Sequence, residues 1–417
     1  MAQHEPWRRA GVSNNTTLVL HCDRPLDPAR VREALDRFLD RCPWPGARLG
    51  RAFPWGKLRW TAGARRTLVA PTVHHREAAP GEDLDRLVEA ELNLAIDPYR
   101  EAPLRLTVVD VAGEQGALIL TWYHPRMDPR GGQNLLAELG GLDAEDGTPT
   151  SQEPAAAGDA APRSLSERGR IARKSLAYMR TLAPFPLVSP GTQMTAPGRA
   201  RFLRARFVER DADARPSRGT REISWRLAVV GKAMAELWRQ RGLPDVPFLL
   251  PIAVDLRPKG EPGPTFGNVL AFHFARFRPS DTDDVPALAR ALRQQMADAV
   301  RDGQIEANAV AMEFLHYRPL SMMLRALPWT SHGELFSFNC ADLAEVPPAL
   351  ACLFGRRVVN VYHAPCVPPR PGLGVFFNRY GGLHNVVVSW IDGAATVDEA
   401  ARILAIVAEE MEWIEKP

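Results

Sequence analysis

The sequence predicts an α+β fold with mixed sheets, arranged in two halves of similar size. Three observations predict it. Short runs of β-branched and aromatic residues alternate with amphipathic stretches of helical spacing, both before and after residue 190. The segment 143–164 is rich in Pro, Ala, Gly, Ser and acids and has no periodic apolar residue, so it is a linker or a mobile surface loop. No repeat of about 20 to 50 residues is visible, which excludes solenoids and propellers.

The first half begins with strand chemistry and a well-marked helix start. Residues 15–22 (NTTLVLHC) are the first expected strand, and Asp27 and Pro28 supply an N-cap and a favourable first residue for a helix to about residue 40. A helix is then expected over 83–94, followed by two strands over 104–111 and 117–123 joined by a glycine-containing hairpin turn.

The second half repeats this mixture. A basic helix over 165–183 ends at a cluster of prolines, and regular structure resumes with a strand at 202–208, so the boundary is placed near 190 with lobes 1–190 and 191–417. The remaining expected elements are helices at 221–240, 284–327 (two) and 397–411, and strands at 248–255, 269–277, 335–340, 358–362 and 374–390, the last folded back at Gly381 and Gly382.

Charge and cysteine usage restrict the function classes. The formal net charge is only +3, which argues against a dedicated nucleic-acid-binding protein, and the 47 Arg against 5 Lys are a bias of the whole chain. The five Cys are scattered, without a zinc-ligand pair or a disulfide framework, which is typical of a reducing compartment. No stretch approaches the ~18 apolar residues of a membrane span. We expect a cytoplasmic monomer without a metal.

The segment 118–139 (LILTWYHPRMDPRGGQNLLAEL) carries the most specific chemistry. A hydrophobic strand leads directly into His124, and Asp128 and a Pro-Arg-Gly-Gly turn precede an amphipathic helix. A strand-to-helix junction on a rigid scaffold can present a reactive side chain, and an imidazole there could act as a general base on a hydroxyl or amine. The alternative is that His124 ends the strand and Asp128 merely opens the turn.

This segment resembles the H-x-x-x-D signature of the chloramphenicol-acetyltransferase-like superfamily, which includes nonribosomal-peptide condensation domains, wax ester synthases and plant acyltransferases. Tyr123 stands where the commonest form has a first His, and Pro129 stands where it has Gly. The resemblance implies two acetyltransferase-like lobes with the active site in a channel between them. It also implies that His124 is the catalytic base and that Asp128 holds the loop through an arginine.

Weaker resemblances follow in the family's order. The opening 18–53 is similar to the family's first strand, helix and motif-tying arginine, for which Arg48 is the first candidate and Arg257 the reserve. PIAVDLRP and FGNVLAFHF resemble a second-lobe strand and Gly-Asn element, and 336–343 and 371–393 resemble the late strands. Asn339 could donate to an oxyanion or could satisfy backbone groups at a sheet end, and Ser337 is the fallback. The candidates for the acyl-donor side of the channel are Tyr123, Pro129, Gly131 and Gly132.

The resemblance implies transfer of an acyl group from a thioester, on coenzyme A or on carrier-protein pantetheine, to a hydroxyl or amine acceptor. Such a protein needs no permanently bound cofactor and would serve lipid or natural-product biosynthesis. A non-catalytic condensation-like module that binds a carrier protein or an acyl ligand is the alternative, and a hydrolase or cyclase on the same scaffold is a third.

Two further groups of residues admit opposing interpretations. The helix 165–183 gathers five basic side chains beside apolar ones, so it is either a docking face for an acidic carrier protein, coenzyme A phosphates or anionic lipid, or a solvated helix. His74 and His75 do not begin a second motif, because Ala79 stands four residues after His75, and a solvated loop pair is expected there. Three other histidines lie in β-rich runs without a partner at metal-ligand spacing, and core or hairpin-surface positions are expected for them: His273, His363 and His384.

Overall fold

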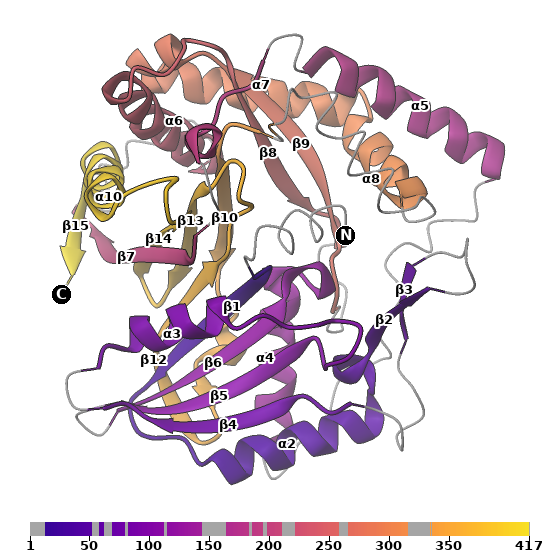
Figure 1. Ribbon diagram of the computed structural model, residues 1–417, viewed down its shortest axis with the longest axis vertical. Coiled ribbons are helices and arrows are strands. Elements are labelled where there is room, and N and C mark those ends of the chain that lie inside the picture. The colour runs from indigo at the N-terminus through magenta and orange to yellow at the C-terminus, as the bar shows by residue number, and fades with distance from the viewer. Residues whose placement is uncertain are drawn as a thin grey trace.

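The computed structural model describes residues 13–51, 58–61, 69–79, 82–111, 115–143, 164–182, 186–194, 198–210, 222–257, 266–315, 334 and 336–416. Over these residues it is the expected mixture of helices and mixed sheets in two lobes (Figure 1). Residues 144–163 of the predicted linker, and residues 316–327 of the predicted helix pair, lie outside the described ranges.

The first lobe is built on a six-stranded sheet in the order β11-β12-β1-β6-β5-β4. All neighbours are antiparallel except β4 and β5. The strands span Cys352–Leu353 (β11), Arg356–Pro365 (β12), Asn15–Cys22 (β1), Gln115–Tyr123 (β6), Leu104–Val111 (β5) and Thr72–Glu77 (β4).

Helices cover both faces of this sheet. α2 (Pro28–Arg41) and α4 (Pro129–Asp143) bury their apolar stripes against one face, together with Leu18, Leu20, Leu118 and Leu120. α2 starts where the sequence predicts, because the Asp27 side chain accepts the Ala29 N–H and Pro28 needs no donor. α3 (Leu84–Asn93) covers the opposite face.

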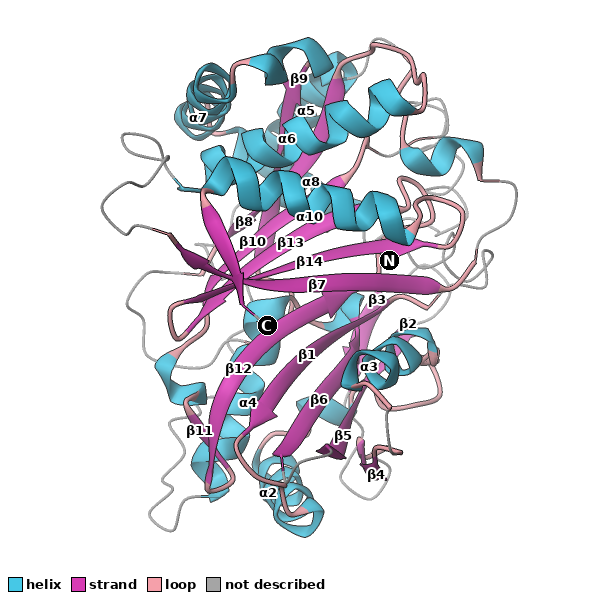
Figure 2. Cartoon of the chain, turned by 90° about the vertical axis from the view of Figure 1, so that its left-hand side faces the viewer, coloured by secondary structure: helices cyan, strands magenta, loops and turns pink. Residues whose placement is uncertain are grey.

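The second lobe contains a five-stranded sheet in the order β10-β13-β14-β7-β15. Its strands span Asn339–Glu345 (β10), Leu373–Tyr380 (β13), Leu383–Ile391 (β14), Ala200–Glu209 (β7) and Trp413–Lys416 (β15). One face packs against α6 (Glu222–Gln240) and α10 (Val397–Met411) in the largest apolar core, which α7 (Val285–Arg301) extends (Figure 2). The other face of the sheet contributes Val387 and Ile391 to the core shared with α3 and the first sheet.

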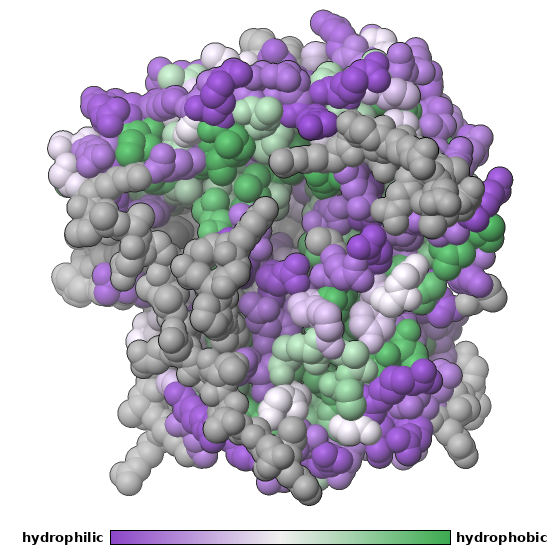
Figure 3. Space-filling view, turned by 180° about the vertical axis from the view of Figure 1, so that it is seen from behind, coloured by the Kyte–Doolittle hydropathy of each residue, from purple (hydrophilic) through white to green (hydrophobic). Residues whose placement is uncertain are grey.

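Two short antiparallel pairs complete the architecture. β2 (Arg48–Arg51) pairs with β3 (Leu58–Thr61), and β8 (Phe248–Asp255) pairs with β9 (Leu270–Phe277). α5 (Leu165–Leu182) and α8 (Gln304–Leu315) pack side by side beyond the β8–β9 pair (Figure 1). Seen from behind, the described upper surface is mostly hydrophilic, with hydrophobic side chains gathered below it (Figure 3).

Strand β12 joins the two halves of the chain. It belongs to the second half of the sequence, yet it pairs with β1 from Thr16 opposite Pro365 to Cys22 opposite Val358. The predicted division at residue 190 therefore assigns β11 and β12 to the lobe whose sheet they do not join. Within the described residues, the sequence-predicted helices and strands are found, except that β10 begins only at Asn339.

Candidate functional site

His124 lies immediately after β6, at the first position of a short 3₁₀ turn, His124–Arg126. Its backbone N–H donates to the carbonyl oxygen of Asn14, at 2.9 Å, which continues the pairing of β6 with the start of β1. The preceding Tyr123 is buried and packs against Trp60, with ring centroids 6.3 Å apart. Tyr123 thus contributes to packing, and its burial raises the pKa of its hydroxyl.

The imidazole of His124 is held in a defined tautomer. Its Nδ1 lies 3.4 Å from the carbonyl oxygen of Met127, which can only accept, so Nδ1 carries the proton and Nε2 keeps its lone pair. Burial disfavours the imidazolium and lowers the pKa of His124, against the opposing effects of the Met127 carbonyl and Asp128. Near neutral pH the side chain is therefore an uncharged base with a free Nε2.

Asp128 is buried and holds the loop through both carboxylate oxygens. Oδ1 accepts the Gly131 N–H at 2.8 Å and Oδ2 accepts the Val269 N–H at 2.9 Å. Arg257 Nη2 donates to both oxygens, at 2.9 and 3.0 Å. One carboxylate thus connects the start of α4 with two segments of the second lobe. Asp128 is an ion-pair and capping residue, and no described hydrogen bond joins it to the imidazole.

Arg257 is the arginine that contacts Asp128, which corrects the order of the two candidates. Its side chain is 13% exposed, and it is oriented by Asp255, whose Oδ1 accepts from both the Arg257 backbone N–H and Nη1 at 3.0 Å. Arg48 is exposed at the start of β2 and makes no described contact with Asp128. The opening segment therefore does not supply the arginine that ties down the motif.

Pro129 occupies the first position of α4, which explains its presence where the family pattern has glycine. A proline there has the right φ and lacks only an N–H that no helix would use. The Gly131 N–H, two residues on, is the one capped by Asp128. Pro129 thus favours the helix start that positions the loop.

Gly131 and Gly132 allow close packing of α4 and do not open a space. A Cβ on Gly131 would meet the Gly267 carbonyl oxygen and Met127 Cβ, both at 3.2 Å, and a Cβ on Gly132 would meet the Trp122 ring at 2.9 Å. Both glycines are buried against protein. They were expected to line the acyl-donor side of a channel, and the structure places them in contact with Gly267, Met127 and Trp122.

Asn268 is a site residue that the sequence analysis did not single out. Its Nδ2 donates to the carbonyl oxygen of Pro125 at 2.8 Å and lies 3.4 Å from that of His124. The neighbouring Gly267 has φ +90° and accepts the Asp128 N–H at 3.2 Å, a conformation that favours glycine. The signal was the Gly-Asn pair in FGNVLAFHF, which was identified only as a similarity.

Asn339 and Ser337 are placed differently from each other. Phe338 and Cys340 belong to the core under α6 and α10, so alternation directs Asn339 to the sheet face on the side of the first lobe. Ser337 precedes the strand, and its Oγ accepts the Leu249 N–H at 3.1 Å. Ser337 therefore anchors β10 to β8. No described contact joins Asn339 to His124, and its role as an oxyanion donor stays a prediction.

The turn after His124 is fixed from the other side by a buried cation. Arg126 stacks over the Trp44 ring at 3.5 Å and lies 4.8 Å from the Trp60 ring centroid. Its Nη2 donates to the Trp44 carbonyl oxygen at 2.6 Å, and burial lowers the pKa of the guanidinium. Arg126 thus holds the loop that carries His124 against two aromatic rings on one side, and the ion pair of Asp128 with Arg257 holds it on the other.

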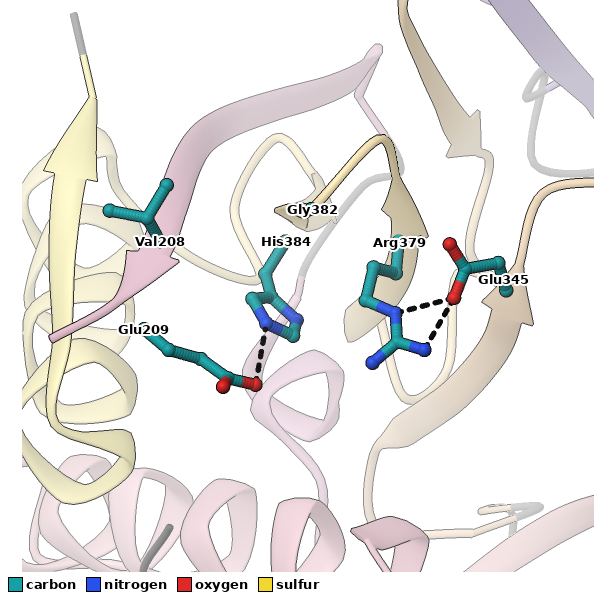
Figure 4. Close-up of a pocket in the computed structure, with 6 residues that line it drawn as sticks. All are labelled: Val208, Glu209, Glu345, Arg379, Gly382 and His384. Carbon is teal, nitrogen blue, oxygen red and sulfur yellow. Dashed lines mark hydrogen bonds and ion pairs between the residues drawn. The ribbon is translucent and has the colours of Figure 1, made fainter. Parts of the chain in front are cut away.

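A separate hollow of about 350 Å³ lies in the second sheet, where β7, β10 and β13 end (Figure 4). Its charged lining is paired internally: Nε2 of His384 lies 3.3 Å from a carboxylate oxygen of Glu209, and Arg379 Nε donates to Glu345 at 2.6 Å. His384 also stacks on Trp413, with ring centroids 4.2 Å apart. These contacts account for His384 as a structural residue of the hairpin.

The basic helix α5 uses only part of its charge for packing. Arg168 pairs with Glu313 and Lys174 donates to the Asp302 carbonyl oxygen, both toward the α7–α8 region. Arg170, Arg173 and Arg180 are exposed beside Leu176 and Met179. Docking by this face stays a prediction.

The described residues contain no helix that is both long and apolar enough to cross a membrane. Nor do they bring three or more His, Cys, Asp or Glu side chains together as metal ligands.

Comparison of the structure with solved structures identifies the fold. The starter condensation domain of rhizomide synthetase RzmA superposes with a TM-score of 0.62 and 14% identity, over 99% of this chain and 94% of that one. The trichothecene 15-O-acetyltransferase TRI3 from Fusarium sporotrichioides gives 0.71 and 11%, over 98% and 93%. The chain has a condensation-type fold. The polyketide synthase associated protein 5 from Mycobacterium tuberculosis gives 0.62 and 16%, over 99% and 96%, so this two-lobed condensation-type fold extends over the whole chain.

The same fold accommodates several reactions. The epimerization domain of tyrocidine synthetase B superposes with a TM-score of 0.65 and 12% identity, over 99% of this chain and 94% of that one. No family model matches the sequence, and no curated protein matches it. The superpositions establish the condensation-type fold, but sequence identities this low do not establish the activity. The activity must be argued from the residues of the site.

Proposed function

We propose that this protein is an acyltransferase that moves an acyl group from a thioester to a hydroxyl or amine, with His124 as the general base. The observation that carries this proposal is the state of the imidazole. Nδ1 faces the Met127 carbonyl, burial lowers the pKa, and Nε2 has no hydrogen-bond partner among the described residues. An uncharged base on a loop clamped from both lobes suits proton removal from a bound nucleophile.

The reaction balances without a further reagent. Nε2 of His124 accepts the proton of the acceptor O–H or N–H as that oxygen or nitrogen bonds to the thioester carbonyl carbon, and the carbonyl oxygen becomes negatively charged. Collapse of this intermediate breaks the C–S bond, and the departing thiolate receives the proton from the imidazolium. In this proposal the Asn339 amide donates to the oxyanion. Because both substrates are held together, no covalent acyl-enzyme is required.

The donor is proposed to be a thioester of coenzyme A or of carrier-protein pantetheine. Support comes from a structural neighbour, a double mutant of the RzmA starter condensation domain in complex with C8-CoA and Leu-SNAC, which superposes with a TM-score of 0.64 at 15% identity. The alternative of a non-catalytic module depended on the two departures from the family motif. Pro129 fits the first position of α4 and Tyr123 is a packing residue, so neither removes the base.

The test is acyl transfer by the purified protein from octanoyl-coenzyme A and from octanoyl-pantetheine to a panel of alcohols and amines, with products identified by mass spectrometry. His124→Ala is expected to lower turnover by about 10² to 10⁴ while unfolding at the wild-type temperature. His74→Ala, an exposed histidine on β4, is the matched control and should keep full activity. Full activity of the His124→Ala variant would refute the mechanism.

A further inference from the structure

His363 is a second buried histidine close to the site. It lies on β12 opposite Leu18 of β1, and its side chain is 1% exposed. Val361, two residues before it, belongs to the core beneath α4, so alternation directs His363 to the same face. Its ring meets the Trp122 ring edge-on, with centroids 6.3 Å apart. In the sequence, nothing separates it from an ordinary core histidine.

The tautomer of His363 follows from its neighbours on α4. Arg130 Nη1 donates to Oε1 of Gln133 at 3.0 Å, which fixes the orientation of that amide. The Gln133 amide nitrogen then points to Nε2 of His363 at 3.2 Å and must donate to it. Nε2 is therefore the acceptor of the ring, and Nδ1 carries the proton.

This Nδ1–H has no hydrogen-bond partner among the described residues. Buried donors without a partner are rare in native structures, because burial removes the hydrogen bonds that water would supply. Thr16 lies diagonally across from His363 in the strand register, and its hydroxyl is also buried and without a described partner. Two unpaired polar groups thus lie together where β1 and β12 approach the site.

His363 and His124 share one short network. Trp122, which His363 touches, donates its indole N–H to the Met127 carbonyl oxygen at 2.8 Å, and this is the carbonyl that faces Nδ1 of His124. A positive charge on His124 would disfavour a positive charge on His363. Through Trp122 and the Met127 carbonyl, the strand that carries the unpaired donor is thus connected to the loop that holds His124.

We propose that His363 is a substrate-binding residue whose Nδ1–H donates a hydrogen bond to an uncharged carbonyl or hydroxyl oxygen of the substrate. This inference rests on the acyl transfer proposed above, and the oxygen belongs either to the thioester donor or to the acceptor. Burial, Arg130 and His124 lower the pKa of His363 to about 3, so the ring stays neutral. A neutral donor in a buried position suits an uncharged oxygen better than a phosphate.

Three substitutions separate this role from a structural one. The amide nitrogen of Asn in His363→Asn takes the place of the Nδ1 donor, whereas the amide oxygen of Gln in His363→Gln takes the place of the Nε2 acceptor, and His363→Phe removes both. Substrate binding through Nδ1 predicts that the Asn variant stays within about threefold of wild type, while the Gln and Phe variants bind one substrate about tenfold more weakly. A purely structural role through Gln133 predicts the opposite order, with Gln tolerated and Asn as damaging as Phe.

Two kinds of measurement are needed. The KM of octanoyl-pantetheine at saturating acceptor, and the KM of the acceptor at saturating donor, show which substrate carries the oxygen, and kcat is expected to change by less than about threefold. Calorimetric binding of octanoyl-pantetheine and of octanol to wild type and the three variants is independent of turnover. Thermal unfolding shows whether each variant is folded.

The outcomes distinguish this inference from the proposed function. Binding weakened in the predicted order, without transfer by wild type, supports His363 as a binding residue and refutes acyl transfer. Transfer by wild type with equal affinities in all variants refutes the inference and supports the proposed function. The Gln-tolerant order, or no binding of either probe to wild type, also overturns the inference.

Discussion

Replacing Arg257 by Ala tests whether the second lobe holds the His124 loop through Asp128. The Asp128 side chain is 4% exposed, and the substitution removes both Nη2 contacts while the Gly131 and Val269 N–H groups continue to donate. Breaking a buried ion pair by removing one partner costs about 3–5 kcal/mol. Because two backbone donors remain and Arg257 is partly exposed, we expect the lower end, about 3 kcal/mol, or roughly a hundredfold in the unfolding equilibrium.

The assay is urea unfolding followed by tryptophan fluorescence, combined with transfer activity. Arg48→Ala is the matched control, because this exposed arginine has no described contact with Asp128 and should change stability by less than about 0.5 kcal/mol. A double-mutant cycle with Asp128→Ala isolates the pair and should give a coupling energy of about 2–3 kcal/mol. Equal stability of the Arg257→Ala and Arg48→Ala variants, or strict additivity in the cycle, would refute the claim that Arg257 holds the His124 loop through Asp128.

Two further predictions concern α4 and the base. Gly132→Ala places a methyl group 2.9 Å from the Trp122 ring. We expect this contact to lower the free energy of unfolding by about 1–2 kcal/mol, even after the gain in helix propensity. The control is Gly141→Ala, whose methyl group meets nothing within 4 Å and should leave the stability in the same urea assay unchanged or raise it by up to about 1 kcal/mol. Burial lowers the pKa of His124, so its uncharged form persists below the pH at which free imidazole is protonated. The kcat/KM of wild type should therefore be constant near neutral pH and decrease only below pH ~6.5. A decrease in kcat/KM that begins above pH ~6.5 would contradict a buried neutral base.

Local signals in the sequence were sufficient for most elements and for the position of His124 in the fold. Asp27 and Pro28 mark the start of α2 because capping chemistry depends only on neighbouring residues. The same holds at Asp128 and Pro129, where the carboxylate caps the third helical N–H and proline needs no donor. The sequence therefore placed His124 correctly at a strand-to-helix junction.

Contacts between residues far apart in the sequence could not be predicted in this way. Arg48 and Arg257 carry the same charge, and only the tertiary structure, in which the connection between β8 and β9 lies beside the His124 loop, brings Arg257 to Asp128. The partners of Asn268 and His363 likewise depend on segments far away in the chain. Periodicity shows which face of a strand is apolar but not which strand pairs with it, and for this reason the crossover of β12 was missed.

The crossover of β12 makes the order of synthesis and the order of assembly differ. β1 is synthesised before β12, and one of its two hydrogen-bonding edges stays open until residues 356–365 have been made, more than three hundred residues later. An open edge of this kind can pair with another chain, so a fragment cut near residue 190 would be prone to self-association. The halves therefore do not mature one after the other, and native pairing of β1 must await most of the chain.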